Sequence, residues 1–333
     1  MKKFGLLIFV GLVLMSCRKE EVGKYEGPSL EEMNTPFAVV TDLAVSQATV
    51  DFSAGEKVTF SAELSKTSAW QLRIIGETSG AEKIVTGTSK IIDATSLEWK
   101  GSTTNLPIFK AEMCQVELTF DGQEDTLIGA VEITEPKVNL GFVVADFESG
   151  FNPGWSSFIQ SGLDMDFQVK SDGDAPEGDR YYNMAGIVDW DYLIGMVNFN
   201  ADAYGGTHFP LNTNPNNVYF NVMVYGEPGL QNSIILFRFE EDENGDGSFN
   251  GANEDLYSIQ VLVNWEGWQL LSFKYSDMVN LVDGVPAVAN GNNTHNPDKL
   301  LTIDMLHLAN PATGLAKSKL DYIIFTENGP LIP

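Results

Sequence analysis

Apolar and polar residues alternate with a period of two in short runs along most of the chain after about residue 37. Glycine, asparagine, aspartate and proline separate these runs, which is typical of half-buried β-strands. No long run has the 3.6-residue period of an amphipathic helix. The pattern therefore predicts an all-β protein.

The first set of runs falls between residues 37 and 136 and covers residues 48–52, 57–64, 69–75, 83–85, 115–120 and 126–133. About seven short strands in about 100 residues are typical of an immunoglobulin-like sandwich. Trp70 and Trp99 fit such a sandwich as core residues. This part contains no histidine and no acid pair at a distinctive spacing, so we expect a spacer domain.

A second set of runs begins at residue 143, after the turn-forming residues 136–139, and continues to the end of the chain. Its predicted strands cover residues 166–170, 191–199, 217–225, 234–239, 257–263 and 268–274, besides the opening and closing runs. Eight or more strands over about 190 residues favour a larger jelly-roll sandwich at residues 143–333.

The net charge of the chain limits the kinds of partner that it can bind. The formal net charge is −26, and 26 acidic but only 7 basic residues follow Val143. Because nucleic acids are bound mainly by lysine and arginine, we expect no nucleic-acid partner. The second domain suits a cation or a neutral ligand better than an anion.

The N-terminus predicts export. A basic start at Lys2 and Lys3 is followed by an apolar run over residues 4–15, too short to span a bilayer as a mature helix. The run ends in Leu-Met-Ser-Cys, which resembles the lipobox of bacterial lipoproteins. The resemblance implies a signal peptide at residues 1–16 and lipidation of Cys17, so that a lipid anchor alone would hold the protein at the membrane.

Residues 17–36 are charged, contain two glycines and a proline, and show no apolar period, which indicates a tether. The start of this tether, Cys-Arg-Lys-Glu-Glu, resembles the charged patch of Bacteroidetes-type surface lipoproteins. That resemblance implies an outer-membrane lipoprotein facing the cell exterior, with a possible transport partner in the same membrane.

The second domain also resembles a known family. The opening Asp-Phe-Glu at residues 146–148, a central Gly-Trp-Gln-Leu-Leu-Ser-Phe at 267–273 and the closing Leu-Asp-Tyr-Ile-Ile-Phe at 320–325 are similar to the galactose-binding-like jelly roll of carbohydrate-binding modules. The resemblance implies a glycan ligand. It also implies a structural calcium ion near the first and last strands. By their position, Glu148 and Asp321 are the candidate ligands of this ion.

A glycine-rich acidic loop lies between the predicted strands 234–239 and 257–263. Its D-x-N-x-D-G spacing is that of a calcium loop, but the twelfth position holds Asn253 and strands replace the flanking helices, which excludes an EF-hand. We predict a hairpin loop that chelates calcium through Asp242, Asn244, Asp246, Glu254 and Asp255. The alternative is an acidic turn without a bound ion, in which asparagine and glycine occur because they readily adopt positive φ angles.

Aromatic residues gather in glycine- and asparagine-rich stretches that we expect to be exposed loops. Aromatic faces pack on the C–H patches of sugars, while carboxylates, amides and arginine satisfy sugar hydroxyls. The candidate sugar-binding residues are Trp155, Arg180, Tyr181, Tyr182, Asp189, Trp190, Asp191, Tyr192, Tyr204 and His208. The alternative is that most of these aromatics pack in the core.

Catalysis has little support in the sequence. His208, His295 and His307 lack metal-ligand spacing, and no serine-nucleophile elbow, zinc motif or phosphate loop occurs. We therefore expect no enzyme, but a lipid-anchored cell-surface protein that binds a poly- or oligosaccharide noncovalently, with calcium as a structural ion. A surface adhesin without sugar binding and a glycoside hydrolase, which would need two carboxylates facing across a sugar, remain the alternatives.

Overall fold

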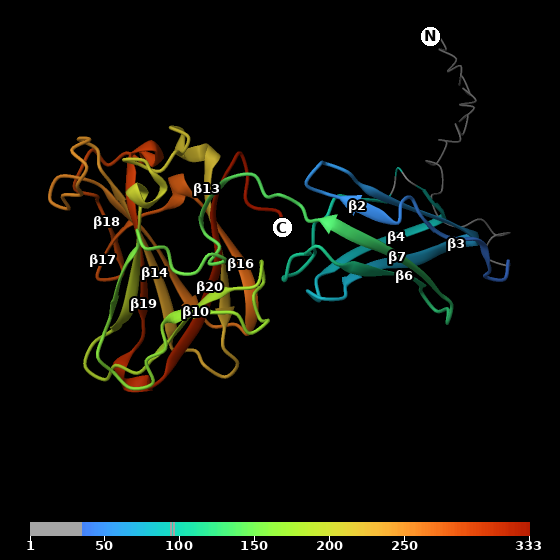
Figure 1. Cartoon of the computed structure of the whole chain (residues 1–333), viewed down its shortest axis with the longest axis horizontal. Helices are drawn as coiled ribbons and strands as arrows, with labels where there is room; N and C mark the ends of the chain where they lie inside the picture. The colour runs from blue at the N-terminus through green and yellow to red at the C-terminus, as the bar shows by residue number, and fades with distance from the viewer. Residues whose placement is uncertain (1–34, 94, 96) are drawn as a thin grey trace, which may run out of the picture.

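A computed structural model describes residues 35–93, 95 and 97–333 (Figure 1). Cys17, the predicted signal peptide and nearly all of the predicted tether lie outside these residues. The prediction of an all-β protein is confirmed, since the described chain forms twenty strands and only short 3-10 turns. Within the described residues, no helix has the length and apolar content needed to cross a membrane.

Seven strands belong to the first domain: β1 (Val39–Val45), β2 (Thr49–Asp51), β3 (Val58–Gly76), β4 (Glu82–Ile92), β5 (Glu98–Trp99), β6 (Met113–Phe120) and β7 (Thr126–Glu135). They form one hydrogen-bonded sheet in the order β1-β3-β6-β7-β2, with β4 and β5 also paired to β3. The sheet encloses a core that includes Trp70 and Trp99.

Strand β3 explains how one sheet supplies two layers. It is 19 residues long; its first part pairs with β1 and its last part with β6. The sequence pattern predicted two strands here, at residues 57–64 and 69–75. They are continuous because the intervening Ser-Lys-Thr-Ser contains no glycine or proline to stop the strand.

The second domain has thirteen strands: β8 (Phe142–Ala145), β9 (Ser156–Ile159), β10 (Gln168–Lys170), β11 (Tyr181–Gly186), β12 (Leu193–Asn200), β13 (Val218–Gly226), β14 (Ser233–Glu241), β15 (Leu256–Val263), β16 (Gly267–Lys274), β17 (Asn280–Val282), β18 (Val285–Ala287), β19 (Leu300–Leu308) and β20 (Ala316–Glu327). Five 3-10 turns connect them: η1 (Ala201–Tyr204), η2 (Pro215–Asn217), η3 (Tyr275–Asp277), η4 (Pro297–Lys299) and η5 (Pro311–Thr313).

Eleven of these strands form a sandwich. A six-stranded sheet has the order β10-β11-β20-β13-β16, with β8 on β20, and a five-stranded sheet has the order β15-β14-β19-β12-β9. The inner faces meet in one apolar core. At its centre the Phe220 ring lies 5.0 Å from the rings of both Phe237 and Phe239, so aromatic packing joins the two sheets.

The two domains are in contact through the outer face of the six-stranded sheet. Leu106 and Ile108 of the first domain pack with Met223, Ile324 and Leu331 of the second. The Ile108 amide also donates a hydrogen bond to the Pro176 carbonyl at 2.8 Å. This contact leaves the outer face of the five-stranded sheet on the opposite side of the sandwich, and Figure 1 shows β14 and β19 away from the first domain.

Candidate functional site

The outer face of the five-stranded sheet carries a patch of polar side chains. Its strands alternate strictly: Phe237, Phe239, Ile303 and Met305 face the core, so the residues between them face outward. The strand registers align these outward residues in rows across the sheet. One row consists of Ser258, Arg238, Asp304, Asn198 and Ser156, and the next of Glu240, Thr302 and Asn200. We call these eight residues the polar face.

Contacts within the polar face hold its side chains in place. The Asn198 amide donates to Asp304 Oδ1 at 2.5 Å, and the Ser156 hydroxyl lies 3.0 Å from Asn198 Oδ1. Arg238 reaches Asp304 at 3.9 Å and Glu240 at 3.7 Å. The guanidinium is therefore shared between two carboxylates and keeps donor capacity for a ligand.

The two carboxylates of the polar face influence each other. Burial raises the pKa of Glu240 above its usual range, the neighbouring Asp304 carboxylate raises it further, and Arg238 opposes the change. Glu240 therefore retains its proton more readily than an isolated glutamate does. A carboxyl that keeps its proton can donate a hydrogen bond as well as accept one.

An apolar row lies directly beside the polar rows. It consists of Leu236, Leu306, Met196 and Phe158, which the registers place side by side. Phe158 is 47% exposed although it is a large apolar side chain. The outer face thus combines hydrogen-bonding groups with apolar surface, which is the combination that a ligand with both hydroxyls and C–H groups needs.

A pocket of about 290 Å³ borders the polar face where β12 and β19 meet the hairpin loop. Asn200 and Thr302 line it together with residues of the η1 segment and Gly247. The Thr302 hydroxyl donates to Asn200 Oδ1 at 3.2 Å. The pocket extends the polar surface toward the loops at this end of the sheet.

Several aromatic residues that the sequence placed in a sugar site lie in the core instead. Trp155 and Tyr182 are 8% and 3% exposed, and Trp155 packs edge-to-face on Phe147 and Phe199. Tyr204 packs against the same core and donates its hydroxyl to the Val144 carbonyl at 2.6 Å. The expectation of an exposed aromatic is wrong for Tyr182, because apolar neighbours cover it. Trp155 and Tyr204 pack against the core but also line a pocket of about 470 Å³, so a sugar-binding role for these two residues stays a prediction.

Tyr181 is also covered, on the other sheet. It is 1% exposed, and its hydroxyl donates to Asp172 at 2.8 Å. The Lys319 ammonium lies 4.8 Å from its ring centroid, and Trp268 contacts the ring edge-to-face. Tyr181 therefore fastens the segment before β11 onto the six-stranded sheet, and its assignment to a sugar site is wrong.

The remaining candidates are more accessible but dispersed. Trp190 and Tyr192 are 63% and 62% exposed in the loop before β12, where Asp189 is also exposed. Asp191 accepts a hydrogen bond from Gln160 at 3.0 Å, and Leu193, the first residue of β12, lies about 17 Å from Asn198 along the strand. These loop aromatics therefore flank one end of the outer face.

Arg180 and His208 do not join those aromatics. The backbone N–H of Arg180 donates to Glu148 Oε1 at 2.8 Å, at the edge of the six-stranded sheet. His208 Nε2 lies 3.2 Å from Asp242 Oδ2 and so supports the hairpin loop. The structure does not bring the ten predicted sugar-binding residues together into one site.

The hairpin loop is held by its own backbone amides. Asp242 is fully buried, and its carboxylate accepts hydrogen bonds from the N–H groups of Gly245, Asp246 and Gly247 at 2.7 to 3.1 Å. Although burial alone raises the pKa of Asp242, the hydrogen bonds lower it overall. The carboxylate is thus satisfied without a cation.

The other predicted loop ligands also point elsewhere. Asn244 accepts from the Asp246 N–H at 2.8 Å, and Asp246 from the Ser248 hydroxyl at 2.7 Å. Glu254 accepts from the Asn250 N–H at 2.6 Å. Each of these carboxylate or amide oxygens caps a nearby turn, which matches the alternative of an acidic turn, and calcium binding by this loop stays a prediction. Asp255 belongs to a different cluster, described below.

The structure brings Glu148 and Asp321 into one acidic cluster with Glu177, which the sequence did not indicate. Burial and the neighbouring Glu148 and Asp146 carboxylates raise the pKa of Glu177 to about 7. Burial and Glu177 raise the pKa of Asp321 well above its usual range. Glu177 Oε2 is buried and has no hydrogen-bond partner among the described residues. Calcium prefers oxygen ligands, and a calcium ion at Glu148 and Asp321 stays a prediction.

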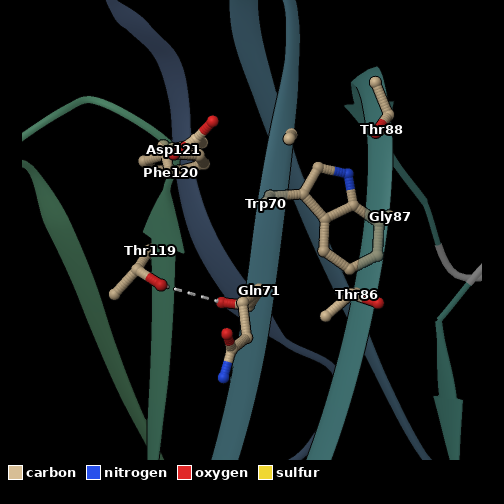
Figure 2. Close-up of a pocket in the computed structure, with 9 residues that line it drawn as sticks. Trp70, Gln71, Thr86, Gly87, Thr88, Thr119, Phe120 and Asp121 are labelled. Carbon is tan, nitrogen blue, oxygen red and sulfur yellow. Dashed lines mark hydrogen bonds between the residues drawn. The ribbon is translucent and has the colours of Figure 1, made fainter.

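A hollow of about 480 Å³ lies on the first domain. Figure 2 shows the Trp70 indole lying over Gly87, with Gln71, Thr86, Thr88 and Thr119 around it. A Cβ at residue 87 would lie 2.2 Å from the indole, so the glycine makes room for this ring. Because Trp70 donates its N–H to Ser89 at 2.9 Å and is 7% exposed, the hollow reflects packing and offers little recognition chemistry.

Comparison with known proteins gives structural neighbours only. No protein-family model matches the sequence. No curated protein matches it either. Solved structures of similar shape include carbohydrate-binding modules.

Three such structures illustrate the range of sequence identity, coverage and TM-score. A carbohydrate-binding module of the β-sandwich superfamily, described for its promiscuous specificity, is 12% identical, covers 88% of this chain and 99% of its own, and has a TM-score of 0.38. A family 11 module from Clostridium thermocellum in complex with a β-1,3-1,4-mixed-linked tetrasaccharide is 16% identical over 57% of this chain and 95% of its own, at 0.38. The xylan-binding domain CBM22-1 from Paenibacillus barcinonensis is 15% identical over 57% and 97%, at 0.30. At these TM-scores, function has to be argued from this chain's own side chains.

A sequence signal for the polar face does exist. Charged or amide residues alternate with apolar ones in Phe-Arg-Phe-Glu of β14, Thr-Ile-Asp of β19 and Asn-Phe-Asn of β12. Alternation alone is common to every solvated sheet face. Only the register of the three strands shows that these polar residues meet.

Proposed function

We propose that the protein binds a poly- or oligosaccharide noncovalently on the outer face of the five-stranded sheet. The observation that carries the proposal is the row of Arg238, Asp304 and Asn198 across three adjacent strands, beside an apolar row. Planar guanidinium, carboxylate and amide groups match the paired hydroxyls of sugars, while the apolar row offers a surface for C–H groups.

The position of the face supports this use. The first domain packs on the other sheet, so a long polymer can cross the five-stranded sheet without meeting it. Trp190 and Tyr192 extend the surface at the end of β12 and supply exposed rings for stacking. Asp304 is only 4% exposed, so a polymer on this face would meet mainly Arg238, Asn198 and the apolar row.

We also propose that a lipid on Cys17 anchors the protein in the outer membrane, facing the cell exterior, where a transport partner would receive the bound glycan. The lipobox-like Leu-Met-Ser-Cys supports the anchor. Tethering many weak sites to one surface raises their effective concentration toward a polymer. In this arrangement a calcium ion held by Glu148, Glu177 and Asp321 would brace the sandwich near the domain contact.

Affinity electrophoresis against a panel of neutral polysaccharides tests the proposal. We expect at least one polymer to retard the wild-type protein, and Arg238→Ala to weaken that retardation about tenfold, because loss of a charge-assisted hydrogen bond costs about 1.5–3 kcal/mol. Lys274→Ala, on the other sheet, is the matched control and should bind as the wild type does.

Each alternative has its own outcome. Retardation by no polymer would reject glycan binding and favour an adhesin. Shortening of the polymer during incubation would show a glycoside hydrolase. Weaker retardation of Trp190→Ala but not of Arg238→Ala would move the site to the loop aromatics that the sequence indicated.

A further inference from the structure

Three carboxylates meet at the base of the β14–β15 hairpin. Glu241 is the last residue of β14 and Asp255 directly precedes β15, and the Glu241 N–H donates to the Asp255 carbonyl at 3.1 Å. Glu243 lies two residues after Glu241 in the sequence. One carboxylate oxygen of each residue lies within 4.8 Å of the other two. We call Glu241, Glu243 and Asp255 the hairpin-base cluster.

The cluster contains a buried oxygen without a partner. Glu241 is fully buried, and its Oε1 accepts hydrogen bonds from the Tyr275 hydroxyl and the Asn296 N–H, both at 2.9 Å. Its Oε2 is buried and has no hydrogen-bond donor among the described residues. Leaving such a group unsatisfied costs about 1–3 kcal/mol, and more when it is charged. A cation close to this oxygen would satisfy it.

The described residues place no ion-pair partner beside the cluster. No lysine or arginine among the described residues lies within ion-pair distance of its three carboxylates. The nearby His295 stacks on Tyr257, with ring centroids 3.9 Å apart, and its Nε2 pairs with the Met278 carbonyl.

The loop at residues 290–296 closes over the cluster. The Gly291 N–H donates to Asp255 Oδ1 at 2.6 Å and the Asn292 N–H to Glu243 Oε2 at 3.1 Å. A Cβ at residue 291 would lie 2.8 Å from the backbone nitrogen of Asp255 as well as 2.0 Å from Glu243 Oε2, so glycine allows this close approach. Such outer hydrogen bonds orient carboxylates for coordination.

We propose that the hairpin-base cluster binds one divalent cation of the calcium type. Three carboxylates offer only oxygen ligands, which calcium and magnesium both prefer, and calcium accepts the irregular, bidentate geometries that a cluster from two strand ends and a loop provides. This site differs from the D-x-N-x-D-G loop, whose oxygens bind its own backbone. The ion would join the hairpin to the loop at 290–296 and fix β14 where Glu240 enters the polar face.

Calcium titration of the EDTA-treated full chain, by calorimetry and by melting temperature, tests the site. We expect Glu241→Gln to lose one bound calcium ion, or to bind it at least about tenfold more weakly. Without calcium, the same variant should be as stable as the wild type or more stable, because it replaces a buried carboxyl by a neutral group of the same shape. A merely structural role of Glu241 predicts the opposite.

Two controls separate this site from others. Asp246→Asn changes an exposed carboxylate of the same hairpin and should bind calcium as the wild type does. Glu177→Gln should leave the hairpin-base ion in place. The proposal is overturned if the wild type binds no calcium, or if Glu241→Gln keeps every ion; should that variant fail to fold, the half-buried Glu243→Gln replaces it with the same two readouts. Glycan retardation plays no part in these measurements, so either proposal can fail alone.

Discussion

At the scale of single residues, burial of a polar side chain without a hydrogen-bond partner determines its protonation. His307 is fully buried on β19, and its ring lies 5.9 Å from that of Phe167. Neither ring nitrogen has a hydrogen-bond partner in the part of the chain that the structure describes. Complete burial lowers the pKa of His307 from 6.5 to about 4. His307 is therefore a core residue.

This burial predicts a stability that depends on pH. Between pH 6.5 and 4 the unfolded chain binds a proton at His307 that the folded chain does not, so His307 makes the free energy of unfolding fall as the pH is lowered. We expect His307→Phe to gain roughly 2–3 kcal/mol relative to the wild type between pH 8 and pH 4.5. Urea unfolding of both proteins at pH 8 and pH 4.5 measures their free energies of unfolding. If the difference between the variant and the wild type is the same at both pH values, the prediction is contradicted.

Asp242 shows the opposite case, in which a buried carboxylate is fully satisfied. We expect Asp242→Ala to lower the free energy of unfolding by about 1–3 kcal/mol, because three backbone N–H groups and His208 lose their acceptor. The loss should be the same in EDTA and in calcium. The exposed neighbour Asp246→Ala should change stability by less than about 0.5 kcal/mol. A loss that appears only in calcium would restore the loop as a cation site.

At the scale of elements, the β14–β15 hairpin separates two kinds of chemistry by alternation. Glu240 faces outward into the polar face, whereas Glu241 faces inward into the hairpin-base cluster. Adjacent residues of a strand point to opposite faces. A shift of the hairpin by one residue would therefore turn Glu240 away from the polar face and Glu241 away from the hairpin-base cluster at the same time. For this reason the position of the hairpin has to be fixed firmly.

At the scale of the whole molecule, the spacer domain is docked onto its neighbour. Ile108 packs between the domains, and Lys110 pairs with Asp179 at 2.8 Å. The two apolar cores are separate. Breaking the contact should thus free the domains without unfolding either.

We expect Ile108→Asp to loosen this contact, since a carboxylate would enter an apolar interface at a cost of about 2 kcal/mol or more. Small-angle X-ray scattering should then give a larger radius of gyration, while each domain keeps its β-sheet circular dichroism signal. Ile128→Asp, at a residue that is 58% exposed, should leave the radius unchanged. An unchanged radius for Ile108→Asp would mean that the remaining contacts hold the domains.

The sequence by itself determined the all-β class, because alternation with a period of two depends only on neighbouring residues. Local patterns also indicated the hairpin between β14 and β15. They could not show which aromatics are buried: Trp155 and Trp190 both flank glycine-rich segments, and only packing separates one from the other.

The tertiary structure alone decided which polar residues meet. Arg238, Asp304 and Asn198 become neighbours through the register of three strands that are distant in the sequence, and Glu241 meets Asp255 because a 13-residue connection returns to its starting point. Pairing between strands and closure of loops are long-range interactions, and no local periodicity encodes them. For that reason the candidate sites lie where the strand registers place them, beyond what the motifs alone could show.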